Sequence, residues 1–270
     1  MRNFTEFTRA RWSVIFKRLV VAECREKTMD ALNLQEQEPG SDIVLGPADR
    51  LSTMLIRAGY QTVARRLVPH QHLYFEQDPR TGVYEVISGT VIQYSLLSDA
   101  RRRIEAFSRP GDLMALGVSG LHDENAEALT DAQVNFIPRA IFDAALCEVS
   151  QFRDAVFSRT EQMLGEARAQ SALIGWKSAL QRTASFFLFL EARFRDPASG
   201  IVRIPMTRRD IADYLGLTIE TVSRMVSRLK QAGAIRMPSP GEFRVVDRLR
   251  LVHESGDLEA DSRLPQRFTA

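Results

Sequence analysis

The sequence predicts an α+β protein with an N-terminal antiparallel β-roll, one long helix and a C-terminal winged helix-turn-helix. Three observations support this order. Short apolar runs alternate with turn residues over about 65–138, which is typical of antiparallel strands. From residue 140 the apolar positions are spaced by three and four, as on one face of a helix. Residues 207–231 then form two short amphipathic segments on either side of a glycine, the pattern of a helix-turn-helix.

These changes of pattern divide the 270-residue chain into five expected parts. They are an N-terminal extension over 1–46, the β-roll over 47–145, the long helix over 146–175, the winged helix-turn-helix over 176–250 and a flexible tail over 251–270. The extension is the hardest part to interpret. It contains an amphipathic run and a linker-like break, QEQEPGS, and Met29 offers an alternative start.

The β-roll is predicted from strand-length runs rich in β-branched and aromatic residues. The runs VYEVI, TVIQYSLL, RIEAF and QVNFIP have this character. Gly82, Gly89 and Gly111 stand at the junctions, and the Pro-Gly-Asp of residues 110–112 is a turn signal. Several short strands at near-regular spacing favour a closed antiparallel barrel or roll.

The stretch that follows predicts a long helix with a narrow apolar seam and charged flanks. A long helix with so thin a seam usually meets an equal partner, as in a coiled coil. We therefore expect a dimer seam formed by Phe152, Val156, Met163, Ala167 and Ile174. The alternative is a helix that packs on its own domain.

The C-terminal part is predicted as a helix over 176–194, a loop over 195–200, a strand over 201–205, the helix-turn-helix and a hairpin wing over 233–247. In the segment TRRDIADYLGLTIETVSRMVSRLKQ, Thr207 is a natural N-cap for the first helix, with Asp210 as its capping-box partner. Gly216 supplies the left-handed residue that the turn needs. Thr218 caps the second helix.

The second helix of such a motif enters the major groove of DNA, with its N-terminal residues on base edges. The expected base readers are Ile219, Glu220, Ser223 and Arg224. Arginine can bond O6 and N7 of guanine together, and a carboxylate can accept from cytosine N4. The alternative is an ordinary salt bridge between Glu220 and Arg224 within the helix. Phosphate contacts, which fix register, are expected from Thr207, Arg208, Arg209, Thr218, Thr221 and Arg228.

The charge of the chain is uneven along its length. The formal net charge is only +2, from 36 basic and 34 acidic residues. Residues 203–250 nevertheless carry +5, which leaves −3 for the rest of the chain. A basic C-terminal domain on a mildly acidic body is consistent with double-stranded DNA as a partner.

Other kinds of site are weakly supported. Two cysteines cannot form a disulfide scaffold or a four-cysteine metal site, and no apolar run is long enough for a membrane span, so we expect a cytoplasmic protein without membrane contact. We expect no enzyme, because no catalytic motif is present. His70 and His72 could be half of a metal site, although surface histidines are the simpler interpretation. Cys147 is compatible with an inert thiol, a redox switch or an intersubunit disulfide.

Over residues 50–250 the sequence resembles the CRP/FNR superfamily of bacterial transcription regulators. The pattern Glu220-x-x-Ser223-Arg224 resembles the E-x-x-S-R of its FNR and FixK branches, and DIADYLGLTIETVSR is especially similar to FixK-type regulators. The resemblance implies a cyclic-nucleotide-binding-like roll and a homodimer that recognises a TTGA…TCAA palindrome. It also implies an activator that contacts RNA polymerase and controls microaerobic, anaerobic or nitrogen-fixation genes. The turn at Asp99 and the basic run 101–103 would be a polymerase contact or simply a solvated turn.

Two departures from the family pattern lead us to expect no cofactor. Cyclic-AMP binders carry a glutamate after the Pro-Gly-Asp turn and an Arg-Ser/Thr pair, whereas this chain has Asp123, Glu124 and Glu127, which would repel a phosphate. Oxygen-sensing FNR proteins use four cysteines for an iron–sulfur cluster, and this chain has only Cys24 near its N-terminus. The alternative function is a regulator gated by an unidentified small ligand in the roll.

Overall fold

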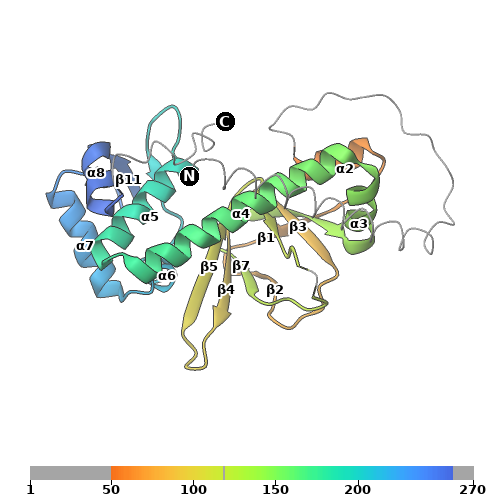
Figure 1. The fold of residues 1–270 in the computed structure, drawn as a ribbon, viewed down its shortest axis with the longest axis horizontal. Helices are drawn as coiled ribbons and strands as arrows, with labels where there is room; N and C mark the ends of the chain where they lie inside the picture. The colour runs from red at the N-terminus through yellow and green to blue at the C-terminus, as the bar shows by residue number, and fades with distance from the viewer. Residues whose placement is uncertain (1–49, 118, 258–270) are drawn as a thin grey trace, which may run out of the picture.

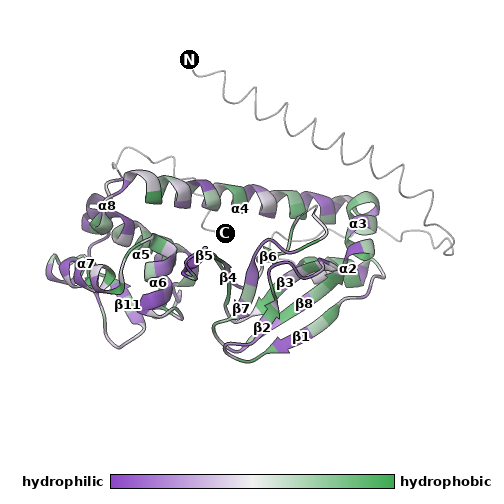
Figure 2. Ribbon diagram, turned by 90° about the horizontal axis from the view of Figure 1, so that it is seen from below, coloured by the Kyte–Doolittle hydropathy of each residue, from purple (hydrophilic) through white to green (hydrophobic). Residues whose placement is uncertain are grey.

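The computed structural model describes residues 50–117 and 119–257. The expected N-terminal extension, Met29, Cys24 and residues 258–270 lie outside the described residues. Within them, a β-roll and a C-terminal helical domain are joined by one long helix, which runs along both (Figures 1 and 2). The predicted α+β class and the order of its parts are confirmed.

The roll consists of two four-stranded antiparallel sheets, in the strand orders β1-β8-β3-β6 and β2-β7-β4-β5. The four strand runs expected from the sequence correspond to β3, β4, β5 and β8. The strands are β1 (Val63–Leu67), β2 (His72–Tyr74), β3 (Gly82–Ser88), β4 (Val91–Leu96), β5 (Arg102–Ser108), β6 (Leu113–Met114), β7 (Asn125–Ala128) and β8 (Ala132–Pro138). Gly89 joins β3 to β4 at a φ of 80°, and a Cβ there would collide with the Asp131 carbonyl oxygen, so this turn needs glycine.

Helices cover one end of the roll. They are α2 (Leu51–Arg57), α3 (Arg139–Glu148) and the first turns of α4 (Ser150–Trp176). The helical stretch expected from the sequence breaks at Val149, whose extended backbone separates α3 from α4. Cys147 lies half-buried on α3. The carboxylate of Glu85, fully buried in β3, accepts bonds from the backbone N–H groups of Leu51 and Ser52, and so anchors the start of α2.

The expected dimer seam is wrong for two of its five residues, Phe152 and Val156. Phe152 and Val156 are buried in the core formed by α2, α3 and the roll, and Met163 packs partly against the same core. The spacing of three and four therefore marks the face of α4 that packs on its own protomer. The physical reason is that a helix along a domain must first bury the face toward that domain. Ala167 and Ile174 are exposed.

The C-terminal domain packs its helices around a second core. Its elements are α5 (Ala179–Phe194), β9 (Val202–Arg203), α6 (Arg208–Leu215), α7 (Ile219–Gln231), β10 (Ile235–Arg236), β11 (Glu242–Val245) and α8 (Arg248–Ser255). The strands form a three-stranded sheet in the order β10-β11-β9, the predicted wing. Helix α5 begins at 179 rather than 176, because Trp176 ends α4 and Ser178 caps α5 with Gln181.

The expectation of a flexible tail from residue 251 is wrong for residues 251–257. Asp247 caps α8, and Leu251 and Ser255 on this helix are buried against the domain. The Lys177 Nζ reaches the Asp257 Oδ1 at 2.7 Å, which ties the end of this segment to the start of α5. An eight-residue helix with few apolar positions gave too weak a periodic signal, and its packing on α5 is what stabilises it.

The roll and the C-terminal domain share an apolar contact. Phe107 of β5 lies against Phe186 of α5 and Tyr214 of α6, with ring centroids 6.1 and 5.1 Å from its own. Burial raises the pKa of the Tyr214 hydroxyl to about 12, so it stays protonated at neutral pH. None of the described helices combines the length and apolar character that crossing a membrane requires.

Candidate DNA-binding interface

The helix-turn-helix has the end geometry predicted from its sequence. Thr207 and Asp210 form a reciprocal capping box at the start of α6, with the Asp210 backbone N–H 3.1 Å from the Thr207 hydroxyl. Gly216 ends α6 in the left-handed conformation, at φ 62°. The Thr218 hydroxyl then accepts the Thr221 backbone N–H and caps α7. These local bonds fix where α7 begins and which of its faces points outward.

Helix α7 is sharply divided into a buried and an exposed face. Val222, Val226 and Leu229 are buried in the domain core. The expected base readers lie on the opposite face, near the N-terminus of α7: Ile219, Glu220, Ser223 and Arg224 are all exposed. The structure therefore brings these four side chains together on one free surface.

Glu220 and Arg224 present an acceptor and a donor on that surface. Within the part of the chain that the structure describes, no ion pair joins the two. Arg224 instead contacts the Thr221 hydroxyl at 3.3 Å. The backbone N–H of Glu220 itself, the Thr218 hydroxyl and then the Arg224 charge lower the pKa of the Glu220 carboxyl. This carboxyl is thus an anionic acceptor at neutral pH, the state needed to accept from cytosine N4.

The expected phosphate contacts differ in how free their side chains are. Arg209 and Arg228 are exposed on α6 and α7. Thr207 and Thr218 are exposed residues, but their hydroxyls already hold the two helix caps, and Thr221 is half-buried beside Thr218. The two arginines are therefore the cations best placed to reach a phosphate.

Arg208 departs from the expectation of an exposed arm. Its guanidinium is half-buried against the wing, with Nη2 3.5 Å from the Met237 sulfur. Burial lowers the pKa of this guanidinium, and its Nη1 has no hydrogen-bond partner among the described residues. Replacing Arg208 would disturb packing between α6 and the wing, so it is a poor probe of phosphate contact.

Arg102 was not predicted from the sequence as part of this site. It extends from β5 of the roll and donates to the Asp210 Oδ1 at 2.5 Å and the Asp213 Oδ2 at 3.4 Å on α6. Asp210 thus serves the capping box and an interdomain ion pair at once. No local pattern could show this contact, since Arg102 and Asp210 are 108 positions apart in the sequence.

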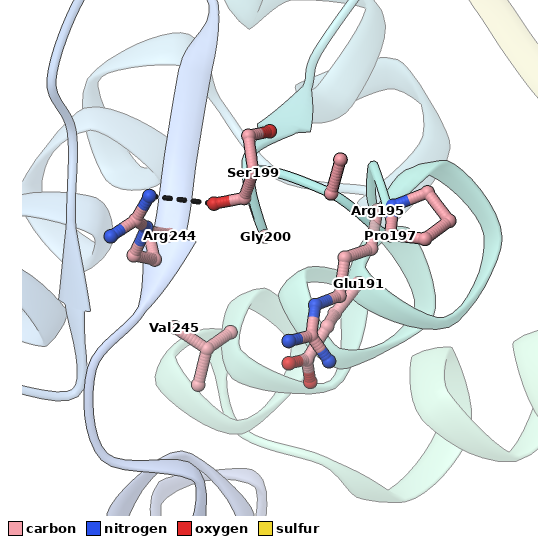
Figure 3. A pocket seen from close by; sticks show the side chains of 8 residues that line it. Glu191, Arg195, Pro197, Ser199, Gly200, Arg244 and Val245 are labelled. Carbon is pink, nitrogen blue, oxygen red and sulfur yellow. Dashed lines mark hydrogen bonds between the residues drawn. The ribbon is translucent and has the colours of Figure 1, made fainter.

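A small polar pocket lies on the same domain, between the end of α5, the 195–200 loop and β11 (Figure 3). Arg244 of the wing crosses it to donate to the Ser199 carbonyl oxygen at 2.6 Å. This contact ties the wing to the loop, so Arg244 is committed to the domain itself.

The acidic residues of the roll are engaged by their neighbours. Glu124 accepts from the Tyr74 hydroxyl at 3.0 Å and from Gln93 at 3.2 Å, and Asp123 pairs with the Arg80 guanidinium. His70, in the turn before β2, and His72 both approach Glu127, and the described residues hold no cluster of three metal-ligating side chains. A phosphate placed among these carboxylates would meet repulsion.

The second half of α4 carries exposed side chains on the side that faces away from the roll. Arg159, Glu166 and Gln170 point toward the roll and α5, where they make hydrogen bonds. Leu164 lies on the far side of the helix and is 50% exposed, and Trp176 at the helix end is 91% exposed. The second half of the helix therefore has an exposed face, offset from the side that Phe152 and Val156 bury, that is available to a partner.

Comparison with known proteins covers both domains. Residues 64–148 match the family described as cyclic nucleotide-binding domain, and residues 181–254 match the Crp-like helix-turn-helix domain. The chain is 38% identical to the nitrogen fixation regulation protein FixK of Bradyrhizobium diazoefficiens, over 60% of this chain and 70% of that protein. It is 36% identical to FixK of Rhizobium meliloti, over 72% and 83%. The structure of FixK2 from Bradyrhizobium japonicum aligns at a TM-score of 0.67 and 35% identity, over 72% of this chain and 96% of that one.

Proposed function

The chain belongs to the CRP/FNR family of DNA-binding transcription regulators, in its FixK/FNR-type group, and from this we propose that it is a homodimeric activator that binds a TTGA-N6-TCAA-like palindrome. One observation carries the proposal: α7 presents Glu220, Ser223 and Arg224 together on a free surface at its N-terminus. We assign Arg224 to the guanine, Glu220 to the opposite cytosine and Ser223 to a thymine, with Ile219 beside them. The target genes are those of microaerobic, anaerobic or nitrogen-fixation metabolism. The activator acts in the cytoplasm, where it contacts RNA polymerase.

The palindrome has two-fold symmetry, so the α7 helices of the two protomers must lie about one DNA turn apart, ~34 Å. We propose that the outer face of α4, centred on Leu164, joins the two protomers. The exposed residues Leu164, Ala167, Ser171 and Ile174 repeat at three and four, the spacing of a coiled-coil face, and two of them belong to the expected seam.

The proposed function is tested by titrating the full chain against labelled DNA in a gel-shift assay at moderate salt. We expect TTGA-N6-TCAA to be bound more tightly than a scrambled duplex of equal composition. Equal affinity for the two duplexes would overturn sequence-specific recognition.

Replacing Arg209 by alanine is expected to weaken binding to every duplex alike. An exposed arginine beside the phosphates contributes through counterion release, so the slope of log K against log salt should fall by about 1 per protomer, or about 2 for the dimer. Binding is measured at several salt concentrations on specific and scrambled DNA. A loss confined to the specific duplex would instead make Arg209 a base reader.

Replacing Leu164 by glutamate is expected to split the dimer. Two carboxylates would meet across the two-fold axis, and we expect the dimer dissociation constant, measured by sedimentation equilibrium, to rise about tenfold or more. Ala169→Glu is the matched control, because Ala169 is an exposed residue on another side of the same helix. Unchanged dimerisation of the Leu164 variant would contradict this choice of face.

A further inference from the structure

Arg182 of α5 joins the end of α4 and the link that follows it to the end of α6, which is 33 positions further along the chain. Its Nη2 donates to the Ile174 carbonyl oxygen at 2.7 Å, and its Nε donates to the Lys177 carbonyl oxygen at 2.9 Å. Its Nη1 donates to the Leu215 carbonyl oxygen at 3.1 Å. One guanidinium thus holds the end of α4, the link between α4 and α5, and the end of α6.

The Ile174 and Leu215 carbonyls are acceptors that their own helices leave open. The last carbonyls of a helix lack intrahelical partners and carry the negative end of the helix dipole. If α4 continued, the Ser178 N–H would donate to the Ile174 carbonyl oxygen. It donates to the Gln181 side chain instead. A planar guanidinium has five N–H donors in a fixed fork and can donate to three acceptors at once. A lysine ammonium has three donors, but their directions are less well defined.

The link between α4 and α5 is tied down on its other side as well. Lys177 donates through Nζ to the Ser185 hydroxyl and to Asp257, each at 2.7 Å. The end of α4 therefore has fixed contacts to α5, to α6 and to the segment after α8. This set of bonds, with Arg182 at its centre, holds the end of the long helix against the C-terminal domain.

The Leu215 carbonyl stands immediately before Gly216, the residue that turns the chain toward α7. Under the proposed function, α4 joins the protomers and α7 reads a half-site. We propose that Arg182 is a positioning residue that sets the distance and angle between the two reading helices, and so the length of spacer that the dimer accepts. This inference rests on the proposed function, because spacer length has meaning only for a dimer on a palindrome.

The test measures affinity for palindromes with spacers of four to eight base pairs, for the full chain and for Arg182→Ala and Arg182→Lys. The wild type is expected to prefer one spacer sharply. Both variants should bind that spacer roughly tenfold more weakly, and should lose most of the preference over spacers one base pair longer or shorter. Their preference for guanine within a half-site should stay at the wild-type value, since α7 itself is unchanged.

Arg195→Ala is the matched control, because Arg195 is an exposed arginine that caps the other end of α5. It should keep the wild-type spacer profile. A stoichiometric titration measures the concentration of protein that can bind DNA. Partial unfolding then lowers this concentration but does not change how affinity depends on spacer length. If either folded Arg182 variant keeps the wild-type profile, the inference is wrong. If the wild type itself prefers no palindrome over scrambled DNA, the proposed function is wrong instead.

Discussion

Replacing Arg224 by alanine is expected to weaken binding to the TTGA-N6-TCAA duplex by about 1–3 kcal/mol per half-site and to remove the preference for guanine. The side chain is exposed near the N-terminus of α7, and only the Thr221 hydroxyl contacts its guanidinium. It is therefore free to give guanine O6 and N7 the bidentate bond that supplies this discrimination. The measurement is a titration against duplexes with each of the four bases at that position, placed symmetrically in both half-sites.

Arg224→Lys serves as the control, because it keeps the charge but loses the fork of donors. It should retain much of the affinity for scrambled DNA, which is mostly electrostatic, while its guanine preference falls. Glu220→Gln is the companion variant and should relax the preference at the paired cytosine position alone. An Arg224→Ala variant that keeps the full guanine preference would show that another residue reads this base pair.

Replacing Arg193 by alanine is expected to lower the free energy of unfolding by about 3–5 kcal/mol. The Arg193 side chain is only 3% exposed. From α5 it donates to Asp112 in the turn of the roll and to Glu166 on α4, and its guanidinium lies 5.4 Å from the centre of the Phe189 ring. Its removal leaves two carboxylates, largely shielded from water, without the cation that they share, which is costlier than losing the bonds themselves.

Denaturant unfolding followed by circular dichroism measures this change. Arg195→Ala, two residues along on the surface, should stay within about 0.5 kcal/mol of the wild type. The triple variant Arg193→Met, Asp112→Asn and Glu166→Gln removes all three charges together, and should recover a large part of the loss. If the triple variant were no more stable than Arg193→Ala alone, unpaired charge would not be the cause.

The strands of the roll and the helix-turn-helix were predicted correctly because their signals are local. A strand run carries its own β-branched residues, and the capping bonds of Thr207, Asp210, Gly216 and Thr218 reach neighbours at most four residues away. Helix α8 was missed, because so short a helix depends on packing against α5 rather than on its own pattern.

The seam of α4 shows a different limit. The spacing of three and four was real, but it marked the face that Phe152 and Val156 bury in their own protomer. Periodicity gives the number and direction of apolar faces on a helix and says nothing of what each face meets. Arg208 and Arg209 are likewise adjacent in sequence, yet the wing covers one and leaves the other exposed.

The sequence by itself therefore determined the order of the domains, the caps and turn of the DNA-reading motif, and the residues on its outer face. Each of these follows from local patterns of side chains and from bonds between residues that are close in the sequence. The tertiary structure decided which arginines are free for DNA, which face of α4 is open to a partner, and how the reading motif is held. The last depends on Arg102 with Asp210 and on Arg182 with three carbonyls. Such bonds join segments from different parts of the chain, and only packing brings their donors and acceptors within reach.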